Sequence, residues 1–244
     1  MNASSLLPII SPSILGLKPE ELKKFLEEIA LLEVELVHLD VVEAGFVNRP
    51  VESTEVENVC RLALLANEIN GLRLDIHLMV EDPRVWLKHI DSKIRPRLKW
   101  EPYISFHPEA ILSSSAKRLI AEIRESGSFP GLAIKPETPI HLLEECFEAG
   151  NPPELIIIMT VNPGISGQKM IIGCLDKVKA LSGLPRPDGP LIEVDGGINL
   201  ETAGLAVESG AEILVSGGFV QEDPSRIRLL RQLGNKINST KKEL

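Results

Sequence analysis

The segment LIIIMTV, residues 155–161, is apolar on both of the faces that a strand would present. A strand without a polar face is typical of a parallel sheet that is covered by helices. Similar short runs recur along the chain and alternate with longer amphipathic stretches. We therefore expect strands near residues 9–13, 35–41, 73–79, 102–107, 131–135, 155–161, 191–195 and 213–216.

The longer stretches between these runs show the 3.6-residue spacing of amphipathic helices. Pro19 and Pro139 stand where prolines of a first helical turn belong. We expect helices near residues 19–31, 54–68, 82–91, 113–127, 139–149, 170–182, 200–209 and 223–237. Eight strand–helix alternations in 244 residues, without a break in composition, predict an α/β fold, a single (β/α)8 TIM barrel.

Three segments stand outside this alternation. Residues 1–7 and 238–244 are expected to be frayed ends of one catalytic domain that spans residues 1–244. Residues 92–102, SKIRPRLKWEP, are basic, and we expect them to form an exposed insertion before the fourth strand.

The composition narrows the class of protein. With 43% apolar residues the chain is globular, and its net charge of −9 argues against non-specific binding of nucleic acid. Cys60, Cys146 and Cys174 are too few and too scattered for a disulfide framework, so we expect a reducing cytoplasmic location. The apolar start of the chain is short and interrupted by proline. It predicts neither a cleaved leader nor a membrane span.

Metal-binding residue types stand at the ends of three expected strands. They are His38 and Asp40 in LVHLDV (36–41), His77 in LDIHLMV (74–80) and Asp195 in LIEVDGG (191–197). The carboxyl ends of all strands in such a barrel meet at one mouth, so we expect these four side chains to converge. Imidazole and carboxylate ligands predict one divalent ion, and Zn²⁺, Fe²⁺, Co²⁺ and Mn²⁺ all remain open.

Glycine-rich loops follow three of the late strands. They contain Gly164, Ser166 and Gly167, then Gly196 and Gly197, and finally Gly217 and Gly218. Backbone N–H groups in such loops can reach a phosphate, and this local field can act even in an acidic protein. Glycines also serve tight turns, which explains any one pair equally well. Three such loops on one rim favour a phosphate site.

Seven motifs, in order along the chain, resemble those of the ribulose-phosphate 3-epimerase family. They are SPSIL (11–15), HLDV (38–41), HLMV (77–80), AIKPETP (133–139), MTVNPGISGQKM (159–170), VDGGI (194–198) and LVSGG (214–218). The resemblance covers nearly the whole chain. It implies a TIM barrel that interconverts ribulose 5-phosphate and xylulose 5-phosphate, a step of the pentose phosphate pathway.

The resemblance also implies roles for individual residues. The divalent metal would be held by His38, Asp40, His77 and Asp195. The expected substrate contacts are Ser13, His77, Gly164, Ser166, Gly167, Gly197, Gly217 and Gly218. Small-molecule sugar phosphate is the expected partner, with no nucleic acid and no membrane, and the family favours a homo-oligomer.

The chemistry of a C3 epimerase assigns a second role to the two aspartates. A proton next to a carbonyl must leave one face of the sugar, and a proton must return on the opposite face. Asp40 and Asp195 come from distant strands, so they can flank a planar enediolate as base and acid. The metal would stabilise that enediolate as a Lewis acid.

Four further residues are candidates for lining the site. Met79 and Met159 end two strands, and His107 and Lys135 end two others. Each also has an ordinary structural explanation, since methionine packs readily in cores. Lys135 has the position of a Schiff-base lysine, but electrostatic support is the interpretation that the resemblance favours.

Two loops depart from the family pattern. Residues 43–49 read Glu-Ala-Gly-Phe-Val-Asn-Arg in place of Asp-Gly-His-Phe-Val-Pro-Asn, and Ile165-Ser166 replaces Phe-Gly before Gly167. We expect both loops on the rim, so the departures bear on the sugar more than on the chemistry. An epimerase of allulose 6-phosphate or of another ketose phosphate is the alternative.

Two other kinds of protein share features of this pattern. Related decarboxylases and aldol-type synthases use Asp-x-Lys-x-x-Asp, whereas residues 40–43 here read Asp-Val-Val-Glu and contain no lysine. A non-catalytic sugar-phosphate-binding protein would keep the pocket, but it would have no need for both Asp40 and Asp195.

Overall fold

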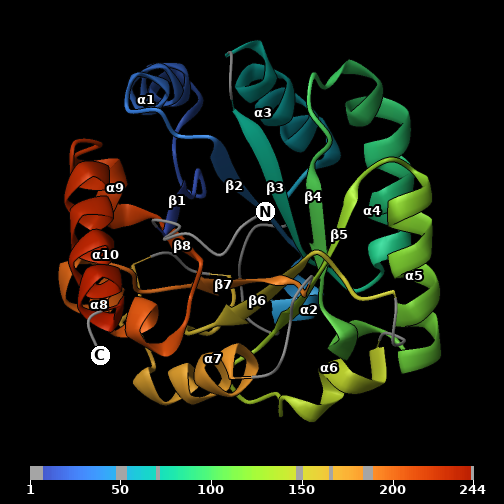
Figure 1. Cartoon of the computed structure of the whole chain (residues 1–244). Helices are drawn as coiled ribbons and strands as arrows, with labels where there is room; N and C mark the ends of the chain where they lie inside the picture. The colour runs from blue at the N-terminus through green and yellow to red at the C-terminus, as the bar shows by residue number, and fades with distance from the viewer. Residues whose placement is uncertain are drawn as a thin grey trace.

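Eight parallel strands occupy the centre of the molecule, and helices surround them (Figure 1). The computed structural model describes residues 8–47, 54–69, 72–146, 151–164, 167–183 and 189–242. The strands are β1 (Ile9–Pro12), β2 (Leu36–Val42), β3 (Arg73–Met79), β4 (Tyr103–Phe106), β5 (Phe129–Ile134), β6 (Leu155–Met159), β7 (Leu191–Asp195) and β8 (Ile213–Ser216).

The sheet closes on itself. The strand order is β1-β8-β7-β6-β5-β4-β3-β2, and every pairing is parallel. The two end strands meet where Ser13 bridges His38 and the Ile14 N–H donates to the His38 carbonyl at 3.1 Å. The predicted (β/α)8 TIM barrel is confirmed.

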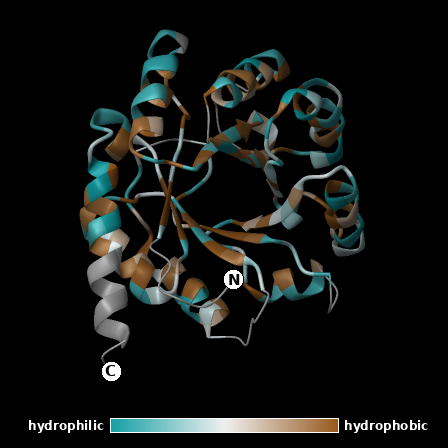
Figure 2. Cartoon of the chain, turned by 45° about the horizontal axis from the view of Figure 1, so that its top comes forward, coloured by the Kyte–Doolittle hydropathy of each residue, from teal (hydrophilic) through white to brown (hydrophobic). Residues whose placement is uncertain are grey.

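Helices cover the outer face of the barrel, with their apolar sides turned toward the strands (Figure 2). They are α1 (Pro19–Leu31), α2 (Ala44–Val47), α3 (Val56–Glu68), α4 (Pro83–His89), α5 (Ser113–Glu125), α6 (His141–Cys146), α7 (Leu175–Ser182), α8 (Leu200–Ser209), α9 (Gly218–Glu222) and α10 (Arg226–Lys242). Local signals set several ends. Asn199 caps α8 by accepting hydrogen bonds from the Glu201 and Thr202 N–H groups, and Gly210 ends that helix at φ 107°.

Strand alternation separates the two sides of the barrel wall. On β2, Val37, Leu39 and Val41 pack in the outer core against the helices. Leu36, two residues before His38, instead joins an inner cluster with residues such as Ile157 and Ile213. Because successive strand residues point to opposite faces, the inner face of β2 continues from Leu36 through His38 to Asp40. The apolar cluster therefore fills the lower barrel, and polar side chains lie above it.

One expected exposed segment is partly buried. A short π-helix (Ile90–Ile94) and a 3-10 turn (Arg95–Arg97) extend α4, and both isoleucines are buried. The prediction of an exposed insertion from residue 92 is thus wrong at Ile94, because Ile90 and Ile94 lie one turn apart and pack into the core.

The ends of the chain, the cysteines and the helix lengths bear on the other expectations. α10 continues to Lys242, so the expected frayed C-terminal end is helical up to that residue. Residues 1–7 and 243–244 lie outside the described residues. Cys60, Cys146 and Cys174 are free, and the last two are buried. Within the described ranges, no helix combines the length and the apolar character needed to cross a membrane.

Candidate functional site

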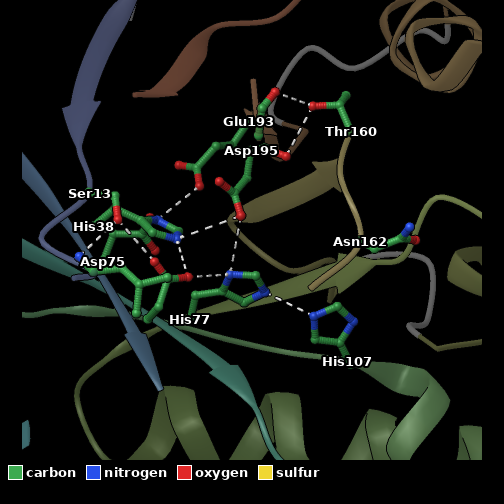
Figure 3. A network of polar contacts seen from close by, with 12 residues as sticks. Ser13, His38, Asp75, His77, His107, Thr160, Asn162, Glu193 and Asp195 are labelled. Atoms are coloured by element: carbon green, nitrogen blue, oxygen red, sulfur yellow. Dashed lines mark hydrogen bonds and ion pairs between the residues drawn. The ribbon is translucent and has the colours of Figure 1, made fainter. Parts of the chain in front are cut away.

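Two histidines and two aspartates converge inside the upper barrel (Figure 3). His38 and Asp40 come from β2, His77 comes from β3, and Asp195 ends β7. One ligand atom of each lies within 4.8 Å of the others. Both histidines are fully buried, and the Asp195 side chain is 14% exposed. The predicted convergence is present, and we call these four residues the polar floor.

The polar floor has the donor set of a divalent metal site. Among the described residues, His77 Nδ1 has no hydrogen-bond partner, although it is fully buried and lies 3.4 Å from Asp40 Oδ1 and 3.6 Å from Asp195 Oδ2. His38 Nε2 lies 3.1 Å from the same Asp40 oxygen and 4.0 Å from Asp195 Oδ2. A buried imidazole nitrogen without a partner, facing two carboxylates, fits a first-row cation.

Two further acidic residues lie beside His38. Its Nδ1 is 2.5 Å from Asp75 Oδ2 and 3.4 Å from Glu193 Oε1, and both carboxyl groups are fully buried. Sequence reasoning missed them. The signal was available, because each stands two residues before a floor residue, in LDIH and LIEVD, and therefore on the same strand face. Burial, and then the charge of Asp75, raise the pKa of Glu193 well above its ordinary value.

The environment separates the two aspartates of the floor. Burial opposes ionisation of Asp40, but the positive charge and the hydrogen bond of His38 outweigh burial and hold the pKa of Asp40 well below the usual range. Burial dominates at Asp195 and raises the pKa of that carboxyl, despite the attraction of His38. Two carboxyl groups with opposed proton affinities suit acid–base chemistry.

Three hydrogen bonds fix the loops around the floor. The Ser13 hydroxyl donates to Asp40 Oδ2 at 3.1 Å. The Gln221 side-chain amide donates to the Ser13 carbonyl at 2.7 Å, which fastens the end of β1 to α9. The Thr160 hydroxyl donates to the Gly196 carbonyl at 2.6 Å and holds the loop after β7. These bonds connect the ends of β1, β2, β6 and β7 around the floor.

A cavity of about 300 Å³ opens above the polar floor. Of the residues expected at the site, those that line it are Ser13, Asp40, Met79, Met159, Gly164, Gly167, Asp195, Gly197, Gly217 and Gly218. We call Gly164, Gly167, Gly197, Gly217 and Gly218 the glycine rim. Asn162, Asn199 and Phe219 also line the cavity and were not predicted. Ser166 lies outside the described residues.

The rim glycines differ in what surrounds them. A Cβ on Gly197 would lie 2.5 Å from the backbone nitrogen of Met170, and its φ of 66° favours glycine. A Cβ on Gly167 or Gly218 would meet no atom within 4 Å. Gly197 therefore serves a close approach between two loops, whereas a side chain at Gly218 would meet open space within the described part of the chain.

Met79 and Met159 occupy the border between floor and rim. Both line the cavity and are 2% exposed, and they form a small apolar cluster with Val42, Phe46 and Val47. They therefore serve both of the predicted functions, lining the site and packing beside it.

His107 and Lys135 lie behind the floor instead of lining the cavity. His107 Nε2 is 2.9 Å from His77 Nε2, and its ring is fully buried. Burial lowers the pKa of His107 to about 4. The Lys135 ammonium lies 3.8 Å from the centre of the Phe46 ring and donates to the Phe46 carbonyl. Sequence alone placed both at strand ends but could not show which way they faced.

Glu43 is the first residue of the altered loop after β2, and it does not line the cavity. Glu43 accepts hydrogen bonds from the Trp86 indole at 2.7 Å and from the Glu81 N–H at 2.8 Å. Glu43 directly follows β2 at the carboxyl end of the barrel, but its carboxylate anchors α4 and does not line the cavity. Residues 48–53 and Ile165-Ser166 lie outside the described residues.

Solved structures with this fold include phosphosugar enzymes. 3-Hexulose-6-phosphate synthase from Salmonella typhimurium superposes with a TM-score of 0.65 at 14% identity, over 93% of this chain and 99% of that one. KGPDC from Streptococcus mutans, solved in complex with a sugar phosphate, has a TM-score of 0.63 at 12% identity, over 96% and 98%. At these identities the likeness concerns the fold.

Sequence comparison is more specific. The chain is 32% identical to ribulose-phosphate 3-epimerase from Bacillus subtilis (strain 168), over 92% of this chain and 97% of that protein. It is 34% identical to the enzyme of the same name from Treponema pallidum (strain Nichols), over 85% and 88%. The model of the ribulose-phosphate 3 epimerase family matches residues 9–221. The motifs, the barrel and these relatives agree, and the chain is an enzyme that belongs to the ribulose-phosphate 3-epimerase family.

Proposed function

We propose that this protein interconverts D-ribulose 5-phosphate and D-xylulose 5-phosphate by inverting C3, and that it needs one divalent metal ion. The observation that carries the proposal is the entry of Asp40 and Asp195 into one cavity from β2 and β7, beside two buried imidazoles. Names of relatives and the epimerase family support the same reaction.

The four residues of the polar floor would hold the metal, which acts as a Lewis acid on the substrate oxygens when bound. His38 and His77 would hold the ion as neutral imidazoles, through the nitrogens Nε2 and Nδ1 that face the aspartates. The identity of the ion stays open among Zn²⁺, Fe²⁺, Co²⁺ and Mn²⁺, because all four accept this donor set.

Asp40 and Asp195 carry the proton transfers. One carboxylate removes the C3 proton, the other in its protonated form returns a proton to the opposite face, and the roles reverse for the back reaction. The Ser13 hydroxyl holds one oxygen of Asp40.

The glycine rim would take the phosphate. The loops after β6, β7 and β8 border the same cavity as Asp40 and Asp195, and α8 begins directly after the β7 loop, so backbone N–H groups of these loops would bind the phosphate. The Streptococcus mutans neighbour of the same fold was solved with a bound sugar phosphate, which supports this class of ligand. Met79 and Met159, which pack in an apolar cluster, would exclude water from the part of the cavity between the polar floor and the glycine rim.

A substrate panel in D₂O tests the proposal. Enzyme depleted of metal and then reloaded with each candidate ion is mixed with ribulose 5-phosphate or allulose 6-phosphate, and deuterium at C3 is measured by NMR. We expect metal-dependent incorporation, fastest with ribulose 5-phosphate. Faster exchange of allulose 6-phosphate would assign the alternative substrate. Binding without exchange of either sugar would identify a non-catalytic binding protein.

A further inference from the structure

A chain of three side chains runs from the polar floor into the barrel wall. His77 belongs to β3, and His107 and Glu109 directly follow β4. His77 Nε2 lies 2.9 Å from His107 Nε2, and His107 Nδ1 lies 3.3 Å from Glu109 Oε2. Both imidazoles are fully buried, so each polar atom must find its partner within the protein.

Only one arrangement of protons satisfies this chain with neutral imidazoles. A carboxylate accepts and does not donate, so the nitrogen of His107 that faces Glu109 must carry the proton. The other nitrogen of His107 is then an acceptor, and the proton between the two imidazoles belongs to His77 Nε2. His77 Nδ1 is left as the lone pair that faces Asp40 and Asp195. The opposite arrangement would put a lone pair of His107 against the Glu109 carboxylate.

Hydrogen bonds hold the Glu109 carboxylate in one orientation, so it can determine which nitrogen of His107 carries the proton. Its Oε1 accepts hydrogen bonds from the Lys135 N–H at 2.9 Å and from the Thr138 hydroxyl at 2.5 Å. The Lys177 ammonium donates to the carbonyls of Lys135 and Thr138, at 3.0 and 2.6 Å, and fixes the turn that supplies those donors. One carboxylate oxygen is therefore committed to the turn, and the other is left for His107.

His38, the other histidine of the floor, contacts a carboxylate directly. His38 Nδ1 lies 2.5 Å from Asp75 Oδ2, with no residue between them. Carboxylates commonly orient metal-binding histidines through the ring nitrogen that does not touch the metal. At His77 an imidazole stands between the ligand and the carboxylate.

We propose that Glu109 is a positioning residue that sets the tautomer of His107 and, through it, makes His77 present an unprotonated Nδ1 to the metal. The inference rests on the proposed metal-dependent function. Neither Glu109 nor His107 lines the cavity, so they act on the reaction through His77 alone.

Glu109→Gln makes a sharp test because its geometry can be anticipated. The amide oxygen must replace Oε1, where two donors meet it, so the NH₂ group faces His107 Nδ1. That nitrogen must then accept, and the proton of His107 moves to Nε2. There it opposes the N–H of His77 across 2.9 Å. We expect the affinity for Zn²⁺ to fall about 10- to 100-fold.

The readouts are the ¹⁵N spectra of the imidazole rings in the metal-free and Zn²⁺-loaded protein, and Zn²⁺ titration without substrate. In the wild type, His107 should be protonated on Nδ1 in both states. In Glu109→Gln it should be protonated on Nε2. Glu154→Gln is the matched control, because it also removes one carboxylate charge, but from a pair with Arg124 ahead of β6.

Three outcomes decide the matter. Wild-type His107 protonated on Nε2 would overturn the inference even if the variant did not fold. Unchanged tautomer and Zn²⁺ affinity in Glu109→Gln, or an equal loss in Glu154→Gln, would overturn it as well. A wild type that binds none of Zn²⁺, Fe²⁺, Co²⁺ and Mn²⁺ while His107 is protonated on Nδ1 would instead contradict the metal-dependent function and leave intact the assignment of the His107 tautomer to Glu109.

Discussion

The polar floor and the glycine rim border the same cavity but are built in opposite ways. The floor consists of long polar side chains on the inner faces of β2, β3 and β7, fixed by strand register. The rim consists of glycines in the loops after β6, β7 and β8 and at the start of α9, and these residues line the cavity without side chains. We therefore expect the chemistry to depend on side chains whose positions follow from strand register, and the fit of the ligand to depend on the loops.

The departures from the family pattern follow this division. All four residues of the floor are present, whereas the altered residues stand in the loops after β2 and β6. We expect variants of the floor to lose turnover and variants of the rim to lose substrate affinity or stability.

Asp195→Asn should have the largest effect. The amide keeps the size of the side chain but cannot exchange the C3 proton, so we expect kcat to fall about 10²- to 10⁴-fold. Zn²⁺ binding should persist in weakened form, because three floor ligands remain. Steady-state kinetics and deuterium incorporation at C3 measure the loss, with the exposed Asp176→Asn on α7 as the control. Turnover equal to the wild type would refute the two-base scheme.

Acid should lower the free energy of unfolding through Glu109, which lies behind the polar floor. Hydrogen bonds from His107, Lys135 and Thr138 outweigh burial and lower the pKa of Glu109 from 4.5 to about 2. The ionised form thus stabilises the fold fully above about pH 4.5, and this contribution is lost as the pH falls toward 2.

The loss at Glu109 should amount to about 3 kcal/mol at most. Denaturant unfolding of the wild type and of Glu109→Gln at several pH values measures it. The difference in stability between the two proteins should shrink across this window. A constant difference would show that Glu109 does not titrate there.

Two substitutions at the rim should separate folding from substrate binding. Gly197→Ala places a Cβ 2.5 Å from the Met170 nitrogen at a φ of 66°, so we expect a loss of about 1–3 kcal/mol in the free energy of unfolding. Gly218→Leu meets open space and should fold normally. Its side chain would fill the proposed phosphate site and raise KM for ribulose 5-phosphate about tenfold or more, a loss of at least about 1.4 kcal/mol in binding.

Thermal unfolding and kinetics on both rim variants provide the measurement. Zn²⁺ affinity of Gly218→Leu should equal that of the wild type, because the floor is untouched. An unchanged KM for Gly218→Leu would remove the rim near β8 from the phosphate site.

Glu193→Gln should have the smallest effect. Burial and the neighbouring Asp75 raise the pKa of Glu193, which favours the neutral form, and an amide has nearly the same shape. We expect a stability within about 0.5 kcal/mol of the wild type at pH 7. Asp75→Asn is the comparison, since it weakens a charged hydrogen bond to His38 and should cost about 1.5–3 kcal/mol. Equal losses in the two variants would show that Glu193 is ionised.

Much of the site follows from local rules. Strand positions could be predicted from apolar runs, and His38, Asp40, His77 and Asp195 from their places at strand ends. Asp75 and Glu193 were accessible to the same rule and were overlooked, because each looked like an isolated acid within an apolar run. The direction of Glu43 was not accessible, because it depends on Trp86 from a different βα unit.

By itself, the sequence determined the barrel, the inner face of each strand and the four polar side chains that converge at the mouth. These depend on a period of two along a strand and on the alternation of strands with helices, both of which are local properties. Only the tertiary structure decided that His107 stands behind His77, that Asp75 lies against His38, and that Glu109 is tied to the turn at Lys135–Thr138. Those pairings depend on how neighbouring strands are staggered when the sheet closes, and the stagger is a property of the whole barrel.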